Sequence, residues 1–226
     1  MTTSVTEFPV RLDDLLLSGY LHRPASPSGH GLVITHGAGA NCETNLLRSV
    51  ASAFAESGVT VLRFNLPFRQ LRSFGPPRPG SAERDQAGIR KAVEAMRKEV
   101  TGRVMMGGHS YGGRQASMLA ASDASVADGL LLLSYPLHPP EKPQQMRTAH
   151  FPDLKTPALF FSGMKDGFAT SEEITAALKL IPARTRLVTV EAAGHELMTK
   201  KNQEGLMRRL VEEYLGFFEL NPGAQG

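Results

Sequence analysis

Short apolar runs alternate with longer segments of helical periodicity along most of the chain. The runs have the length of buried strands and lie at 31–35, 59–64, 103–107, 130–133, 157–161 and 186–190. Between them, apolar residues recur every three or four positions, which predicts helices at 43–57, 82–100, 114–121, 172–180 and 203–218. Strands that alternate with helices in this way favour an α/β fold with a mostly parallel sheet and helices on both faces.

Three parts of the chain depart from this alternation. Residues 6–11 and 15–22 are separated by two aspartates, and they predict an N-terminal antiparallel β-hairpin. Residues 65–81 are rich in Pro, Gly and Arg and predict a loop, whose part at 69–80 either gates a site or, as we favour, covers the sheet. Residues 134–156 form a connection too long and too rich in proline for an ordinary link, and we expect it to line the mouth of a site.

Composition narrows the class of protein further. The 226 residues suit a single domain at 1–226, and the formal net charge of +3 comes from scattered basic residues, so we do not expect nucleic-acid binding. The one cysteine, Cys42, excludes a disulfide framework. Residues 1–14 lack the features of a signal peptide, and no apolar run has membrane-spanning length. We therefore expect a cytoplasmic protein without a membrane span.

The most informative motif lies where the strand at 103–107 meets the helix at 114–121. Residues 108–112 read Gly-His-Ser-Tyr-Gly, which matches Gly-x-Ser-x-Gly. This pattern also occurs by chance in glycine-rich loops, but the order of strand, serine and helix is the context of a nucleophile elbow. On such a sharp turn the serine is strained, and side chains at the flanking glycines would collide with neighbouring elements. The motif predicts that Ser110 is an activated nucleophile.

A serine nucleophile needs a general base, and the base needs an orienting acid, in the chain order Ser, Asp or Glu, His for an elbow. His195 follows the last predicted strand, where parallel sheets present ligand-facing residues, and Asp166 lies just beyond the strand at 157–161. His195 could instead only cap the last helix, and Asp166 could form a surface Asp-Gly turn. His138 is the competing base. We favour Asp166 and His195.

An acyl-transfer site also needs donors for the oxyanion. We expect the backbone N–H of Tyr111 to be one, and that of Ala38 to be the other, because residues 35–40 read Thr-His-Gly-Ala-Gly-Ala after an early strand. Taken alone, that loop could be only a tight turn. The residues expected to contact a partly apolar acyl substrate are His36, Gly37, Gly39, Phe68, His138 and Phe168. No cluster with metal-ligand spacing is present, and we expect no metal and no cofactor.

These motifs together resemble an α/β-hydrolase of the dienelactone-hydrolase-like group, from about residue 31 to residue 218. Four segments resemble more closely a subfamily of small hydrolases that includes testis-expressed protein thirty, and they lie at 63–68, 112–117, 135–140 and 166–168. The resemblance implies an α/β-hydrolase fold without a large lid. Dienelactone hydrolase proper has a cysteine at the elbow, where this chain has Ser110, so a cyclic dienelactone is not the expected substrate. Cys42 lies elsewhere and is expected to be a small buried residue.

The sequence thus predicts a serine hydrolase that cleaves an ester, thioester or related acyl bond of a small molecule through an acyl-enzyme. An acyltransferase or a perhydrolase would use the same intermediate. A non-catalytic interaction module that retains the fold is the alternative from another class. Fold alone does not establish activity, which keeps that alternative open. The complete set of nucleophile, acid, base and oxyanion loop counts against it, because a decayed enzyme tends to lose at least one of these parts.

Overall fold

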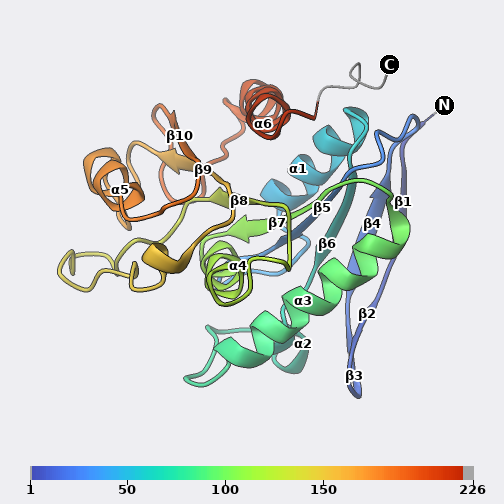
Figure 1. Ribbon diagram of the computed structural model, residues 1–226, viewed down its shortest axis with the longest axis horizontal. Coiled ribbons are helices and arrows are strands. Elements are labelled where there is room, and N and C mark those ends of the chain that lie inside the picture. The colour runs from blue at the N-terminus through green and yellow to red at the C-terminus, as the bar shows by residue number, and fades with distance from the viewer. Residues whose placement is uncertain (1, 221–226) are drawn as a thin grey trace.

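A mixed sheet runs through the centre of the molecule, in a computed structural model that describes residues 2–220 (Figure 1). Residue 1 and residues 221–226 of the expected 1–226 domain lie outside the described residues. The eight strands, in sheet order, are β1 (Ser4–Glu7), β4 (Gly19–Arg23), β6 (Thr60–Phe64), β5 (Gly31–Thr35), β7 (Val104–His109), β8 (Gly129–Leu133), β9 (Ala158–Gly163) and β10 (Thr185–Val190). From β6 to β10 all neighbours are parallel, as predicted.

Helices cover both faces of this sheet (Figure 1). They are α1 (Asn45–Glu56), α2 (Pro67–Leu71), α3 (Ala82–Glu99), α4 (Tyr111–Ser122), α5 (Ser171–Leu178) and α6 (Gln203–Phe218). Apolar residues of α1 and α6 share one buried cluster with the sheet, and those of α3, α4 and α5 share the other. Every residue of β5, β6 and β8 is buried, which explains why these strands read as continuous apolar runs.

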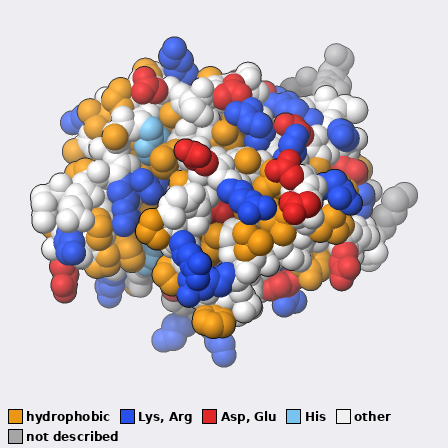
Figure 2. Space-filling view, turned by 90° about the horizontal axis from the view of Figure 1, so that it is seen from below, with side chains coloured by type: hydrophobic (Ala, Val, Ile, Leu, Met, Phe, Trp, Pro, Cys, Tyr) orange, Lys and Arg blue, Asp and Glu red, His pale blue; other side chains and the backbone are white. Residues whose placement is uncertain are grey.

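The outer surface of α3 carries charges that pair locally. Arg90 meets Asp123 at 2.6 Å, and Lys91 meets Glu94 at 2.7 Å. On the face seen from below, where α2 and α3 lie in Figure 1, basic, acidic and apolar side chains are interspersed (Figure 2). The polar side of this amphipathic helix therefore faces solvent, and its apolar side packs on the sheet.

The predicted N-terminal antiparallel hairpin is present, but each of its two strands is interrupted. The segments at 6–11 and 15–22 divide into two separate pairs: β1 with β4 at the edge of the main sheet, and β2 (Val10–Leu12) with β3 (Leu15–Leu17) in a two-stranded sheet. Pro9 has no N–H to donate and interrupts the first strand. On the other strand, the Ser18 N–H donates to the side chain of Gln70 at 3.1 Å instead of to a strand.

The prediction that 65–81 is entirely loop is wrong, because α2 lies within it. Pro67 occupies the first turn of this helix, a position where proline is favoured because its missing N–H would have no partner. The carboxylate of Asp85 in α3 accepts a hydrogen bond from the Phe68 N–H at 3.0 Å. That contact across 17 residues stabilises a helix too short to be indicated by periodicity.

Residues 2–220 contain no lid inserted over the sheet, in agreement with the expected fold class. The long connection at 134–156 has a single 3-10 turn, Phe151–Asp153, as its regular structure. Without a lid, the carboxyl ends of the parallel strands are bordered only by loops and helix ends.

Within the described part of the chain, no helix combines the length and the apolar character needed to cross a membrane.

Candidate active site

Ser110 lies between the end of β7 and the start of α4, in a left-handed backbone conformation with φ of 50°. A side chain in this region is strained, and the strain persists only where neighbouring contacts impose it. Here the Ser110 N–H donates to the Leu133 carbonyl at 2.8 Å, and the Ser110 carbonyl accepts from the Arg114 N–H at 3.0 Å. The turn is thus held from β8 on one side and from α4 on the other.

The glycines that flank Ser110 allow the end of β5 to approach the turn. A Cβ atom at Gly112 would lie 2.6 Å from the His36 carbonyl oxygen, and a Cβ at Gly108 would collide with the Thr35 carbonyl oxygen. Both contacts involve backbone that cannot move independently of the sheet. Side chains are therefore excluded at both positions, for the physical reason that the motif suggested.

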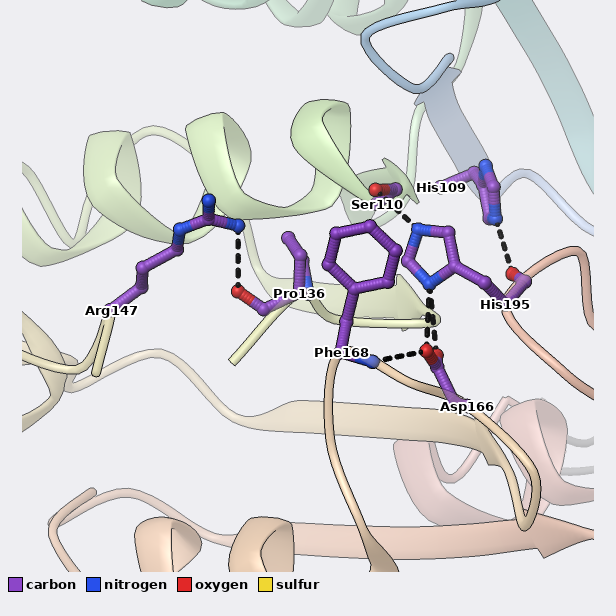
Figure 3. Close-up of polar contacts among 7 residues, drawn as sticks. All are labelled: His109, Ser110, Pro136, Arg147, Asp166, Phe168 and His195. Carbon is purple, nitrogen blue, oxygen red and sulfur yellow. Dashed lines mark hydrogen bonds and ion pairs between the residues drawn. The ribbon is translucent and has the colours of Figure 1, made fainter. Parts of the chain in front are cut away.

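The side chains of Ser110, His195 and Asp166 form one hydrogen-bonded chain (Figure 3). His195 Nε2 lies 2.8 Å from Ser110 Oγ, and His195 Nδ1 lies 3.0 and 2.9 Å from the two carboxylate oxygens of Asp166. A carboxylate only accepts, so Nδ1 carries the proton and Nε2 accepts from the serine hydroxyl. The side chain of Asp166 is fully buried and also accepts the Phe168 N–H at 2.8 Å.

Two further aromatic rings hold His195 in place. Phe168 stacks on the imidazole with ring centroids 4.1 Å apart, and His109 Nε2 donates to the His195 carbonyl at 2.8 Å (Figure 3). Burial lowers the pKa of His109, which keeps the ring neutral. Sequence reasoning treated His109 as the variable residue of the elbow and missed this contact, since its partner is a backbone atom far away in the chain.

The predicted oxyanion donors are the backbone N–H groups of Ala38 and Tyr111. Tyr111 is the first residue of α4, where no intrahelical acceptor exists, and within residues 2–220 neither N–H donates to another protein atom. Both residues line the same cavity as Ser110. The positive end of the α4 dipole adds to the favourable potential for negative charge at this point.

His36 fixes the peptide that carries the Ala38 N–H. Its Nδ1 donates to the Gly37 carbonyl at 2.9 Å, and its Nε2 accepts the Leu66 N–H at 3.1 Å. In a trans peptide the N–H points away from the carbonyl, so holding the Gly37 oxygen sets the direction of the Ala38 N–H. His36 is fully buried, and burial lowers its pKa to about 4.

Arg69 holds the same loop from the other side. This buried guanidinium donates to the carbonyls of Ala40 at 2.6 Å, Ala38 at 3.0 Å and Gly75 at 2.9 Å. Residues 2–220 offer it no carboxylate partner within ion-pair distance. Arg69 therefore joins the loop after β5 to the loop after α2 by hydrogen bonds to their backbone carbonyls. Sequence reasoning missed this role.

A cavity of about 1150 Å³ opens in front of Ser110. The predicted contact residues Gly37, Gly39 and Phe168 line it, and the connection at 134–156 contributes Pro136 and Arg147, as expected of a segment at the mouth of a site. The loop at 69–80 contributes Pro76 and Pro77, so this loop borders the cavity rather than only covering the sheet.

Three of the predicted substrate contacts, His36, Phe68 and His138, lie outside this cavity. His36 has both ring nitrogens in use, as described above. Phe68 is buried and packs edge-on against Tyr111 at 5.6 Å between ring centroids. Tyr111 in turn donates its hydroxyl to the Asp85 carboxylate at 2.7 Å. Phe68 therefore supports the wall of the site instead of contacting its contents.

His138 is placed away from Ser110. Its Nδ1 lies 2.8 Å from the Pro139 carbonyl, and its Nε2 lies 3.2 Å from the Glu173 carboxylate. Both partners only accept, so the imidazolium alone satisfies both contacts. The hydrogen bond to Pro139, and then Glu173, raises the pKa of His138 despite its partial desolvation.

Cys42 is buried, and burial raises the pKa of its thiol to about 11. A thiol held in this form is a poor nucleophile. Among the residues that the structure describes, no three His, Cys, Asp or Glu side chains gather into a group that could hold a metal ion.

Residues 28–216 match the family described as "Alpha/beta hydrolase domain". The chain also superposes on Est1E from Butyrivibrio proteoclasticus with a TM-score of 0.75 and 19% identity, covering 94% of this chain and 99% of that one. The values for dienelactone hydrolase from Anabaena variabilis are 0.75 and 18%, with 96% and 99% covered. At such identities these likenesses establish the fold.

A further match is XC6422 from Xanthomonas campestris, described as an α/β serine hydrolase without lid. Its TM-score is 0.70 at 18% identity, with 93% of this chain and 95% of that chain covered. A lidless fold of this kind leaves the carboxyl edge of the sheet bordered by loops and helix ends, as in this chain.

Proposed function

The chain belongs to the alpha/beta hydrolase domain family, and on this premise we propose that it is a serine hydrolase that cleaves an ester, thioester or related acyl bond. One observation carries this proposal: the unbroken chain of hydrogen bonds from Ser110 through His195 to the buried Asp166. A nucleophile, a base and an orienting acid in this order are the parts that acyl transfer to serine requires.

In the proposed reaction Ser110 Oγ attacks the acyl carbon while His195 Nε2 takes its proton across 2.8 Å. Asp166 keeps His195 in the required tautomer and stabilises the imidazolium that forms. His195 then gives the proton to the leaving group as the bond to the acyl carbon breaks. A water molecule next attacks the acyl-enzyme while His195 takes its proton, and His195 returns that proton to Ser110 Oγ as the acid product leaves. Phe168 stacks on the imidazole and restricts its rotation between these steps, and His109 holds the backbone that carries it.

The N–H groups of Ala38 and Tyr111 are the proposed oxyanion donors. Loss of one such donor typically costs about 10²- to 10³-fold in kcat. In this chain the donors are backbone atoms, so the residues that orient the loop take the place of a donor side chain. These are His36 and Arg69, which hold the carbonyls of Gly37 and Ala38.

The proposed substrate is a small molecule, because the cavity of about 1150 Å³ in front of Ser110 is comparable in size with small-molecule sites. We further propose carboxylesterase-type activity, a single domain at 1–226, a cytoplasmic location and no cofactor or nucleic-acid partner. The segments at 63–68 and 135–140 support membership of the subfamily that includes testis-expressed protein thirty.

Labelling with a fluorophosphonate probe tests the proposal. The folded protein is expected to gain one probe mass, and Ser110→Ala should gain none, because phosphonylation requires an activated serine. Esters of 4-nitrophenol with rising acyl length would then measure the size of the acyl pocket. A folded protein that gains no probe and cleaves no ester would instead be a non-catalytic module that retains the fold.

A further inference from the structure

Two arginines line the cavity beside Ser110 and take no part in the proposed proton transfers. Arg114 lies in the first turns of α4, four residues after the nucleophile, and Arg147 lies in the connection at 134–156. Figure 3 shows Arg147 beyond Pro136 and Phe168 as seen from His195. Both arginine side chains are half-buried. Arg147 lies on the side of the cavity away from His195 (Figure 3), near enough to Arg114 for the two charges to interact.

Neither guanidinium has the carboxylate partner that a half-buried arginine normally has. Within residues 2–220 no carboxylate lies within ion-pair distance of Arg114 or Arg147. Arg114 Nε is buried and has no hydrogen-bond acceptor among the described residues. Arg147 Nη1 makes one long bond, 3.4 Å, to the Pro136 carbonyl. Buried charges in proteins are normally paired, so this arrangement lacks a negative partner.

The surroundings supply no carboxylate that pairs with the two arginines, although Asp153 is near enough to His150 to oppose the lowering of its pKa. Desolvation, and then the neighbouring charge of Arg114, lower the pKa of Arg147. The same two causes lower the pKa of His150 to about 4, so this nearby ring is neutral. Of the two carboxylates that line the cavity, Glu43 pairs with Arg63 at 3.0 Å, and Glu196 directly follows His195 at the opposite end. The arginine end therefore carries net positive charge.

We propose that Arg114 and Arg147 form an anion subsite that binds a carboxylate or phosphate group carried by the substrate. The inference rests on the proposed function, because the subsite is defined by its place beside Ser110. Guanidinium groups match these planar or tetrahedral oxyanions through parallel N–H bonds. Arg114 lies about 6 Å along α4 from Ser110, so the bound anion is a short chain away from the acyl carbon. The substrate class is an ester or thioester with a second, anionic group.

The test compares anionic and neutral substrates of equal size. One pair differs on the acyl side: the 4-nitrophenyl monoester of glutaric acid against that of its monoamide. The other pair differs on the leaving group: 4-carboxyphenyl butanoate against 4-carbamoylphenyl butanoate. We expect kcat/KM to favour the anionic member of at least one pair by about tenfold or more, as for a charge-assisted hydrogen bond. Inhibition by glutarate and by inorganic phosphate is then compared, and the stronger inhibitor shows whether the subsite prefers a carboxylate or a phosphate group.

Substitutions test whether Arg114 and Arg147 cause the preference for anionic substrates, measured as the anionic-to-neutral ratio of kcat/KM. Arg114→Gln and Arg147→Gln should each reduce the anionic-to-neutral ratio about tenfold. Arg208→Gln, which removes an exposed charge on α6 outside the cavity, should leave the ratio as it is. If Arg114→Gln does not fold, Arg114→Lys keeps the charge but not the planar fork, and should reduce the ratio by a smaller factor.

The subsite can fail while the proposed function stands. If neutral esters are hydrolysed but the anionic-to-neutral ratio is close to one for both pairs, the subsite is wrong and the serine hydrolase stands. If no ester is hydrolysed and Ser110 is not labelled, the proposed function is wrong. The subsite is then measured by the rise in unfolding temperature that glutarate or inorganic phosphate gives Ser110→Ala. Absence of a rise, or an equal rise after Arg114→Gln, overturns it.

Discussion

Two histidines follow parallel strands of this sheet, and each lies within hydrogen-bond distance of a carboxylate. His195 contacts Asp166 through Nδ1 and Ser110 through Nε2. His138 contacts Glu173 through Nε2 but the Pro139 carbonyl through Nδ1. Pairing with a carboxylate therefore does not distinguish a general base from a structural histidine.

The partner of the second ring nitrogen makes the distinction. Ser110 Oγ can donate, so the neutral ring of His195 satisfies both contacts and keeps a lone pair on Nε2 for the serine proton. The Pro139 carbonyl cannot donate, so His138 satisfies both contacts only as an imidazolium and has no lone pair to offer. His36 is a third case, a neutral ring whose Nε2 already accepts a backbone N–H.

The substitution Asp166→Asn is expected to have the largest effect on activity, because it removes the feature that distinguishes His195 from His138. The asparagine amide can donate to His195 Nδ1, which favours the tautomer with the proton on Nε2, facing Ser110. We expect kcat for a 4-nitrophenyl ester to fall by about 10³- to 10⁴-fold. Asp153→Asn is the matched control, since Asp153 is exposed in the 3-10 turn. A fall of the same size in both variants, or in neither, would contradict the assignment of Asp166.

A smaller effect is expected where the backbone of His195 is held. His109→Leu removes the donor to the His195 carbonyl while keeping a side chain of similar size. We expect kcat to fall about tenfold through loss of orientation, and the free energy of unfolding in urea to fall by about 1–2 kcal/mol. His109→Gln can still donate and should recover much of both. A loss of stability with unchanged kcat would show that His109 does not position the base.

The smallest effect on activity is expected at His138, where the change lies in stability and depends on pH. The folded pKa of His138 is raised by Pro139 and Glu173, with the charge of Arg147 opposing. Its contribution to stability is therefore fully present below the unfolded pKa of about 6.5 and is lost as the pH rises through the folded pKa. His138→Gln should lower the free energy of unfolding more at about pH 5.5 than at about pH 8.5.

Glu173→Gln is the control for that pH dependence. Glu173 also accepts the Thr170 N–H at 2.9 Å at the start of α5, and glutamine preserves this capping box. The variant removes the charge next to His138 without removing the cap, so it should weaken the pH dependence. An equal loss of stability at both pH values in His138→Gln would contradict the imidazolium assignment.

Hydrophobic periodicity was enough to predict the parallel sheet and the helices that cover it, because buried strands and amphipathic helices have distinct periods. It was not enough to predict the helix within residues 65–81 or the division of the N-terminal strands. The helix α2 depends on the Asp85 carboxylate, which lies in the next helix, and the N-terminal strands divide where Pro9 has no N–H. Both features arise from individual hydrogen bonds rather than from a repeated pattern.

The candidate site shows the same division. The order of motifs along the chain indicated Ser110, Asp166 and His195, and the fold places both Ser110 and Asp166 within hydrogen-bond distance of His195. The order says nothing about His109 and Arg69, since each acts on backbone carbonyls of a distant loop. It also placed His36 and His138 at the substrate, because residue type alone does not reveal which ring nitrogens are already in use.

The rate at which a fluorophosphonate labels Ser110 tests the central claim most directly, because it isolates the activation of the serine by its base. We predict that the second-order rate constant falls by about 10³-fold or more in His195→Gln and stays within about twofold of the unsubstituted protein in His138→Gln. The opposite result, a large fall in His138→Gln with His195→Gln unaffected, would contradict the account.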